Sequence, residues 1–411
     1  MGIISNRTPV LLLTGFGGQE RALELAEPGT VVIHHDLSGL REGMVVRTEA
    51  TVRPDGTAEE RVALLELAHG CVSCTLREDL LPLLRALRRR AGVRRIVVRL
   101  DPTLEAEALC HAIEHVVVEM VGEVPGPAAR DVEVVGVIGF VDGHTWLDDA
   151  LGEEDLHERF AVPDDDERTV AQLAVGHAAC ADLLVVGGDS PDPTRLRAVL
   201  RRLAPGAPIA RERVPLANLL QRLPGRRPAL EPFGPLLAGC PPLEPDGDVR
   251  LVEYSGRRPM HPGRFHEAID VLLDGVVHAR GRIWLATRPD EALWLESAGS
   301  GLRVGPAGRW LAAGGEGTPE RWAMANAAWD EEHGDRATSL VALVAGADPD
   351  RVLETLRWAE LDEREFAGGP SAWAGWPDPF GEMHADPCED LNPDTADPSD
   401  AGAGTEQKEN R

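Results

Sequence analysis

Residues 10–22, VLLLTGFGGQERA, decide how the first half of this chain is interpreted. The run Val10 to Leu13 has the apolar character of a strand, a glycine-rich turn follows it, and Gln19 to Leu25 has a helical pattern. Backbone N–H groups of such a turn and of the following helix can bind phosphate. Gly15, Gly17 and Gly18 are therefore candidate residues for binding a nucleotide cofactor.

The side chains that a phosphate-binding loop normally uses are replaced. Such a loop has glycine, lysine and a hydroxyl residue after four intervening positions, and counting from Gly15 places Glu20, Arg21 and Ala22 there. Glu20 would repel phosphate, Ala22 cannot bind Mg²⁺, and Arg21 supplies charge without a compact ammonium group. Two interpretations stay open: the glycines serve only the turn, or some nucleotide affinity survives with Arg21 as a contact. Neither predicts hydrolysis by the usual route.

Outward from this stretch, strand-like and helical segments alternate. The apolar runs are nearly continuous, which is typical of strands that are covered on both faces. We expect a doubly wound, mostly parallel sheet of the α/β class. The predicted strands are Val10–Leu13, Val31–Ile33, Ile96–Leu100, Val132–Val141 and Leu183–Val186, and the predicted helices include Gln19–Leu25, Leu76–Leu87 and Leu104–Val118.

The composition changes along the chain and predicts four parts. Residues 1–204 form the α/β domain, and residues 205–248 form a linker rich in proline and arginine. Eight of the nine tryptophans lie in residues 284–376, so a second, smaller α+β domain is expected over residues 249–381. Residues 382–411 are acidic and lack an apolar face, which predicts a disordered tail.

Charge and cysteine content exclude several classes of protein. The 42 basic and 69 acidic side chains give a formal net charge of −27, which argues against binding nucleic acid directly. The chain has six cysteines in 411 residues, too few for a disulfide scaffold, and no apolar stretch long enough to cross a membrane. We expect a cytoplasmic protein that does not associate with membranes. Its only lysine is Lys408, so no mechanism in a folded site can use one.

Residues 69–75, HGCVSCT, carry the strongest chemical signal. A C-x-x-C turn presents two thiolates to one tetrahedral metal ion, and sulfur ligands favour Zn²⁺ in a reducing compartment. We predict that Cys71 and Cys74 bind zinc. Because zinc needs further ligands, we add one or two of His34, His35, Asp36 and His69, the first three of which follow a predicted strand. Two alternatives remain: a thioredoxin-like redox pair, and two reduced thiols without a function.

Other motifs are weaker. Residues 111–115, HAIEH, match the H-x-x-E-H pattern of some metalloproteases, although short patterns of this kind arise by chance and a solvated helix face is the simpler interpretation. The remaining cysteines are isolated in the sequence, and we interpret them as packing or tail residues. They are Cys110, Cys180, Cys240 and Cys388.

Several segments together resemble the CobW family of P-loop GTPases and metallochaperones, from Pro9 to about Phe380. They are GCVSCTLR at residues 70–77, RPMHP at 258–262, GRIWLATR at 281–288 and GPAGRW at 305–310. The resemblance implies a P-loop NTPase-like domain followed by a CobW C-terminal domain. The chain departs from the family pattern in three places. It lacks the phosphate-loop lysine and hydroxyl, it has VVGGDS at 185–190 in place of the guanine-reading N-K-x-D, and Arg99 replaces the acidic Walker B neighbourhood.

The chain looks most similar to an actinobacterial branch of that family, in which C-x-x-C replaces C-x-C-C. The resemblance implies a zinc-responsive regulatory protein that brings a ribosome-hibernation factor to the small ribosomal subunit under zinc limitation. The alternative is a GTP-hydrolysing metallochaperone that delivers zinc to client apoproteins. Zinc is the expected cofactor in both cases, whereas GTP is expected only for the second, so whether the chain is an enzyme stays open.

Overall fold

The computed structural model describes residues 7–67, 72–225, 227, 239–327 and 329–381. The side chains of residues 72–74 and 320 are not described. The predicted tail, 382–411, lies outside these ranges, as do His69 and Cys71.

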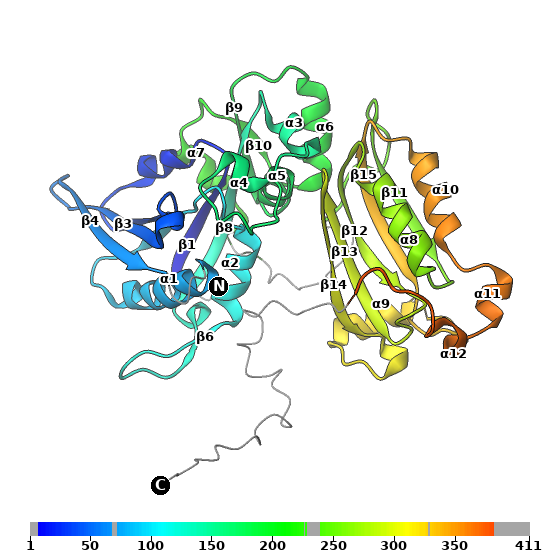
Figure 1. Ribbon diagram of the computed structural model, residues 1–411. Coiled ribbons are helices and arrows are strands. Elements are labelled where there is room, and N and C mark those ends of the chain that lie inside the picture. Colours follow the sequence, from blue (N-terminus) through cyan, green and yellow to red (C-terminus); the bar gives the residue numbers. More distant parts are fainter. Residues whose placement is uncertain (1–6, 68–71, 226, 228–238, 328, 382–411) are drawn as a thin grey trace, which may run out of the picture.

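An eight-stranded sheet forms the first half of the molecule, in the order β10-β9-β8-β1-β5-β2-β3-β4 (Figure 1). All neighbours are parallel except the pairs β2–β3 and β3–β4. This arrangement confirms the predicted fold class. The strands are β1 (Thr8–Gly15), β2 (Thr30–Asp36), β3 (Met44–Val52), β4 (Ala58–Glu66), β5 (Arg95–Arg99), β8 (Val132–Asp142), β9 (Leu183–Gly187) and β10 (Ile209–Arg211).

Helices cover both faces of this sheet, because its central strands are apolar on both sides. On one face, Ile33 of β2 packs with Leu80 and Leu84 of the longest helix. On the other face, Val32 packs with Ala22 and Leu25. One face carries α1 (Val72–Arg89), α2 (Ala106–His115), α5 (Val170–Ala179) and α6 (Pro193–Leu203), and the other carries η1 (Gln19–Leu25) and α7 (Leu216–Leu219).

Short elements complete the first half. They are η2 (Leu40–Glu42), β6 (Val117–Val118), β7 (Gly126–Pro127), η4 (Ala128–Arg130), α3 (Trp146–Leu151), α4 (Leu156–Arg159) and η5 (Leu220–Arg222). Residues 205–248, predicted as a linker, contribute β10, which pairs with β9, as well as α7 and η5.

The strand β4 lies at one edge of the sheet and was not predicted. Its residues Glu60, Val62, Leu64 and Glu66 are all exposed, so one face of the strand is uncovered. The sequence offers only a four-residue apolar run here, residues 62–65, with Arg61 before it and Glu66 after it, which is too short a signal to predict a strand.

The second half contains an antiparallel five-stranded sheet in the order β11-β15-β12-β13-β14. Its strands are β11 (Val249–Gly256), β12 (Val276–Trp284), β13 (Glu291–Ala298), β14 (Gly301–Arg309) and β15 (Thr338–Ala345). The helices are α8 (Pro262–Ile269), η6 (Asp270–Leu272), η7 (Leu311–Ala313), α9 (Pro319–Ala327), α10 (Pro349–Ala359), α11 (Glu363–Ala367) and α12 (Pro370–Trp373).

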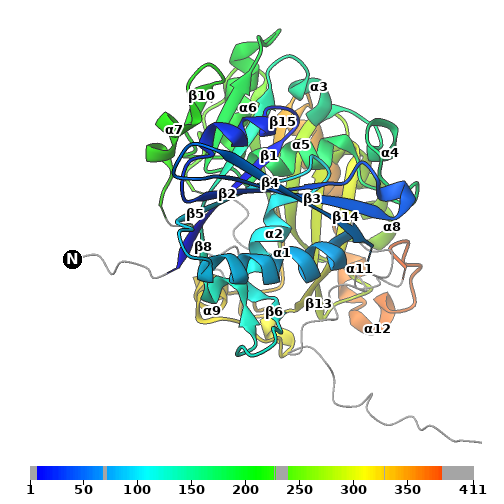
Figure 2. The same cartoon turned by 90° about the vertical axis from the view of Figure 1, so that its left-hand side faces the viewer.

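The two halves share one hydrophobic cluster. Alternate residues of β15 point to opposite sides: Leu340 and Ala342 pack with α8 and α10, whereas Leu343 and Ala345 pack against α5 and α6 of the first half. Figures 1 and 2 show the second sheet lying against the face of the first sheet that α5 and α6 cover. The helices α5 and α6 are therefore buried between two sheets.

Candidate functional site

The glycine-rich turn links β1 to η1 and needs glycine for steric reasons. Gly15, Gly17 and Gly18 have φ values of +120°, +79° and +78°. A Cβ atom on Gly15 would collide with the carbonyl oxygen of Phe140 in β8, and one on Gly18 would lie 2.6 Å from the Phe140 ring. A Cβ atom on Gly17 would meet nothing within 4 Å. Only Gly17 is therefore held to glycine by backbone conformation alone.

The side chain of Gln19 folds back into this turn. It is 4% exposed, and its amide nitrogen donates a hydrogen bond to the carbonyl oxygen of Gly15. The element that begins at Gln19 has the predicted bounds but is a 3₁₀ helix rather than an α-helix. Ala22 is fully buried beneath it. Gln19 and Ala22 are thus occupied by contacts within the fold, whereas Glu20 is exposed.

Arg21 connects η1 to the segment before α7. Its Nε lies 2.6 Å from Oε1 of Glu24, and its Nη2 donates to the carbonyl oxygen of Val214 at 2.9 Å. Glu24 also accepts a hydrogen bond from the backbone N–H of Leu216. The hydrogen bond from Arg21 lowers the pKa of the Glu24 carboxyl below its ordinary value. Among the described residues, Nη1 of Arg21 has no hydrogen-bond partner.

His35 lies on the face of β2 that α1 covers. Its side chain is 3% exposed, and its Nε2 lies 2.8 Å from Oδ2 of Asp79, a residue of α1. The other carboxylate oxygen of Asp79 accepts from Arg47 of β3. The imidazole is therefore held between the sheet and the helix that contains Cys74, whose own side chain is not described.

His34 and Asp36 lie on the opposite face of the same strand. Nδ1 of His34 is 3.1 Å from the carbonyl oxygen of Arg99, and Asp36 accepts from the backbone N–H of Ser38 at 2.9 Å. Burial lowers the pKa of His34, so this imidazole is neutral near pH 7. Burial would raise the pKa of Asp36, but the hydrogen bonds from Ser38 outweigh it and keep the pKa low. Adjacent residues of a strand point to opposite faces, so His34 and His35 cannot share one ion.

The described residues do not form a complete metal site. Nowhere in them do three or more His, Cys, Asp or Glu side chains come together in a way that could hold an ion. The H-x-x-E-H pattern in α2 is no exception: the rings of His111 and His115 stack on each other, with 4.4 Å between their centroids.

Among the described residues, no helix has the length and hydropathy that a membrane crossing requires.

The structure brings together two cysteines that the sequence leaves apart. Cys110 of α2 and Cys180, which ends α5, both lie near the guanidinium of Arg227. Seventy residues separate the two thiols, and no local motif indicates the contact.

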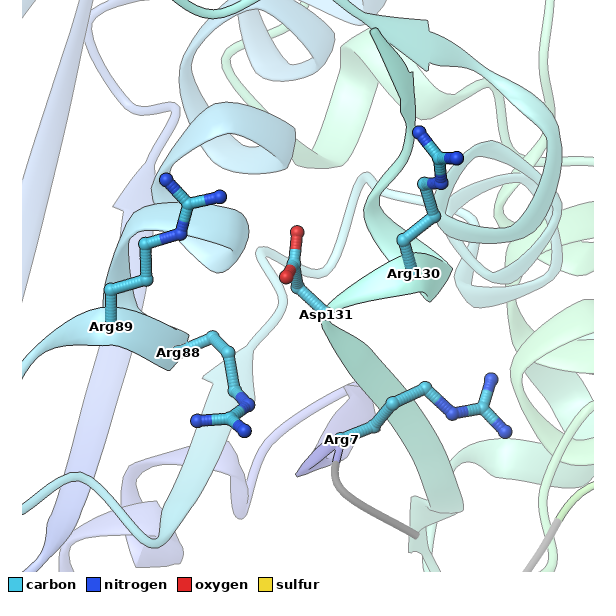
Figure 3. A pocket seen from close by; sticks show the side chains of 5 residues that line it. All are labelled: Arg7, Arg88, Arg89, Arg130 and Asp131. Atoms are coloured by element: carbon cyan, nitrogen blue, oxygen red, sulfur yellow. The ribbon is translucent and has the colours of Figure 1, made fainter. Parts of the chain in front are cut away.

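A shallow cavity of about 290 Å³ lies at the other end of β1, away from the glycine-rich turn (Figure 3). Its arginines already have partners: Arg7 donates to the carbonyl oxygen of Ala129, and Arg130 donates to that of Pro125. The side chains around it are those of Arg7, Arg88, Arg89, Arg130 and Asp131.

Comparison with known proteins agrees with this architecture. Residues 32–208 match the family model of the CobW/HypB/UreG nucleotide-binding domain, and residues 249–360 match that of the cobalamin synthesis protein cobW C-terminal domain. These two matches define a nucleotide-binding domain followed by a CobW-specific one. The chain belongs to the CobW family.

Two relatives extend over most of the chain. The zinc chaperone Rv0106 of Mycobacterium tuberculosis is 47% identical over 401 residues, which are 95% of this chain and 96% of the relative. The zinc-regulated GTPase metalloprotein activator 1 of Dictyostelium discoideum is 23% identical over 91% of this chain and 84% of that protein. The solved Zn(II)-bound YjiA GTPase from E. coli covers 86% of this chain and 99% of its own, with a TM-score of 0.34 and 13% identity.

Proposed function

We propose that this protein is a zinc-binding metallochaperone-type protein whose zinc is held by Cys71, Cys74 and His35 and whose phosphate loop no longer supports GTP hydrolysis. The observation that carries the proposal is the 47% identity to a zinc chaperone along nearly the whole chain, together with the C-x-x-C motif. Thiolate and imidazole donors suit Zn²⁺.

The contact between His35 and Asp79 favours His35 as the third ligand. A zinc-binding histidine usually donates its second ring N–H to a carboxylate, which fixes the tautomer and raises the basicity of the ligating nitrogen. Asp79 accepts from Nε2, which leaves Nδ1 for the metal. His35 also faces the helix that contains Cys74, whereas His34 faces away. His69 is a further candidate, as in the sequence prediction.

The geometry of the glycine-rich turn supports the loss of hydrolysis. Gln19 donates its hydrogen bond within the turn, Arg21 pairs with Glu24, and Ala22 is a core residue. None of these residues can position Mg²⁺, and Glu20 adds negative charge where phosphate would bind. GTP and Mg²⁺ therefore do not fit this site, and we derive no catalytic step from them.

Zinc content of the purified, reduced protein tests the proposal. We expect about one zinc per chain, lost in a Cys71→Ser, Cys74→Ser double variant. His35→Ala should weaken zinc affinity at least about tenfold, because a ligand is removed. His34→Ala is the matched control and should leave the affinity unchanged. Undiminished zinc in the double variant would contradict the site, and equal affinities for the two histidine variants would contradict the role of His35.

GTP turnover separates this proposal from the GTP-hydrolysing chaperone. We expect no Mg²⁺-dependent release of phosphate above the buffer rate. Turnover that disappears in an Arg21→Ala variant would favour the hydrolysing alternative instead.

The partner is a further part of the proposal. The resemblance implies recruitment of a ribosome-hibernation factor under zinc limitation, and the zinc-chaperone relatives favour client apoproteins. Affinity capture from zinc-starved and zinc-replete cells tests both. Enrichment of a hibernation factor and small-subunit proteins only in starved cells would support recruitment, whereas enrichment of apo-metalloproteins would support delivery.

A further inference from the structure

A buried pair of thiols lies outside the proposed zinc site. Cys110 and Cys180 are each 5% exposed and belong to helices α2 and α5, which pack together. The guanidinium of Arg227 contacts both: Nη1 lies 3.2 Å from Sγ of Cys110, and Nη2 lies 3.4 Å from Sγ of Cys180. One cation thus holds two sulfur atoms side by side.

The surroundings of the pair shift the pKa values of the two thiols in opposite directions. The hydrogen bond from Cys180 lowers the pKa of Cys110, and the charge of Arg227 acts in the same direction, although burial opposes both. The same hydrogen bond and burial raise the pKa of Cys180. Asp182 lies 3.1 Å from Nε of Arg227 and fixes the guanidinium from its other side. Cys110 is therefore the more nucleophilic sulfur and Cys180 the proton donor.

We propose that Cys110 and Cys180 are a reversible modification site, at which hydrogen peroxide converts the two thiols into an intramolecular disulfide. The thiolate of Cys110 attacks a peroxide oxygen, the O–O bond breaks, and the departing hydroxide takes the proton of the Cys180 thiol and leaves as water. Cys180, now a thiolate, attacks the sulfenic sulfur of Cys110 and the S–O bond breaks. The departing hydroxide takes up the proton that Cys110 released on ionising, and a second water leaves. Two thiols and one peroxide give one disulfide and two waters.

Burial makes this site selective for a small oxidant. Peroxide is close to water in size, whereas attack on glutathione disulfide requires a bulky molecule to reach a sulfur that is 5% exposed. The adjacent second thiol resolves the sulfenic acid, which protects Cys110 from oxidation to sulfinic acid. Disulfide formation also removes both thiol groups beside Arg227, a residue of the segment between β10 and β11.

Peptide mapping of the full-length, reduced, zinc-loaded protein tests the proposal. The protein is treated with hydrogen peroxide, residual thiols are alkylated, and the digest is analysed by mass spectrometry. We expect a linked peptide pair that contains Cys110 and Cys180, reversed by a dithiol reductant and absent with glutathione disulfide over the same time. Arg227→Gln should slow its formation at least about fivefold, because the thiolate loses its cation.

Two variants sharpen the result. Cys240→Ser changes an exposed cysteine and should leave the linked pair intact. Cys180→Ser should turn the disulfide into stable sulfenic or sulfinic acid at Cys110. Wild-type protein that gives only sulfinic acid at Cys110, or that cross-links only Cys71 with Cys74, would overturn the proposal whether or not the variants fold. Because the readout is a mapped bond, failure of the zinc proposal would not affect it.

Discussion

At the residue scale, three glycines of one turn face different constraints. Gly15 lacks both the space and the backbone conformation for a side chain, whereas Gly17 lacks only the conformation. A side chain in left-handed backbone costs about 1–2 kcal/mol, and a collision with backbone atoms adds to this because strands in a sheet core cannot move apart cheaply.

The two glycines give a matched prediction. Gly17→Ala should lower the free energy of unfolding by about 1 kcal/mol. Gly15→Ala should lower it by about 3 kcal/mol or more, because the alanine Cβ also displaces Phe140 of β8. Urea denaturation followed by circular dichroism measures both. Equal losses would show that contact with Phe140 has no energetic weight.

At the element scale, α5 owes its position to contacts on several sides. It begins at a capping box, in which Thr169 accepts from the backbone N–H of Gln172 and the Gln172 side chain accepts in return. In its last turn, His177 is 3% exposed, and its Nε2 lies 3.0 Å from the carbonyl oxygen of Leu104, so this nitrogen carries the proton. The His177 ring also stands edge-on to Phe16 of the glycine-rich turn.

His177 should make stability fall in mild acid. Burial lowers its pKa to about 4, below the ordinary 6.5 of an unfolded chain. The unfolded state therefore binds more protons between these values, and stability that is complete above pH 6.5 is lost as the pH falls toward 4. At pH 5 the loss is about 2 kcal/mol. The His177→Gln variant keeps an N–H donor without a titrating ring. Between pH 7.5 and pH 5 the unfolding free energy of this variant should fall by about 2 kcal/mol less than that of the wild-type protein. Identical pH dependence in the two proteins would show that His177 does not contribute.

At the scale of the whole molecule, the two halves meet through closely packed small residues. A Cβ atom on Gly301, at the start of β14, would lie 2.6 Å from the side chains of Gln172 and Thr169. Arg195 of α6 adds polar contacts, to the carbonyl oxygen of Ala345 at 2.8 Å and to Asp248 at 2.9 Å. This packing predicts that both halves unfold together.

Substitutions at two glycines of β14 test this contact between the two halves. Gly301→Val should push α5 away, lower the melting temperature, and split the single calorimetric transition into two. Gly305→Val is the control, because a Cβ atom there meets nothing within 4 Å. A single, unshifted transition in Gly301→Val would mean that the halves do not depend on this contact.

Much of the fold follows from the sequence, because apolar runs decide which segments become buried strands. The predicted runs lie in β1, β2, β5, β8 and β9. β3 was missed because charged residues interrupt it, and β4 because its apolar run of four residues is short and flanked by charged residues. β13 and β14 were not predicted either. The 3₁₀ geometry of η1 was also missed, since propensity alone does not distinguish it from an α-helix.

The candidate site was predictable only where one local motif contains it. The alternation of side chains along a strand already places His34 and His35 on opposite faces of the sheet. Only the fold shows that His35 makes a hydrogen bond with Asp79. Cys110 and Cys180 meet through helix packing across seventy residues, and no spacing rule encodes such a contact. Cys71 and Cys74 remain predicted zinc ligands.

The uncovered side of β4 presents two apolar side chains, Val62 and Leu64, between two acidic ones, Glu60 and Glu66. At low ionic strength, Glu60 and Glu66 should repel the β4 edge of a second copy of this protein. Salt screens these charges and allows Val62 and Leu64 of the two copies to make contact. Salt should therefore promote self-association of this protein along a backbone edge that is still able to accept another strand.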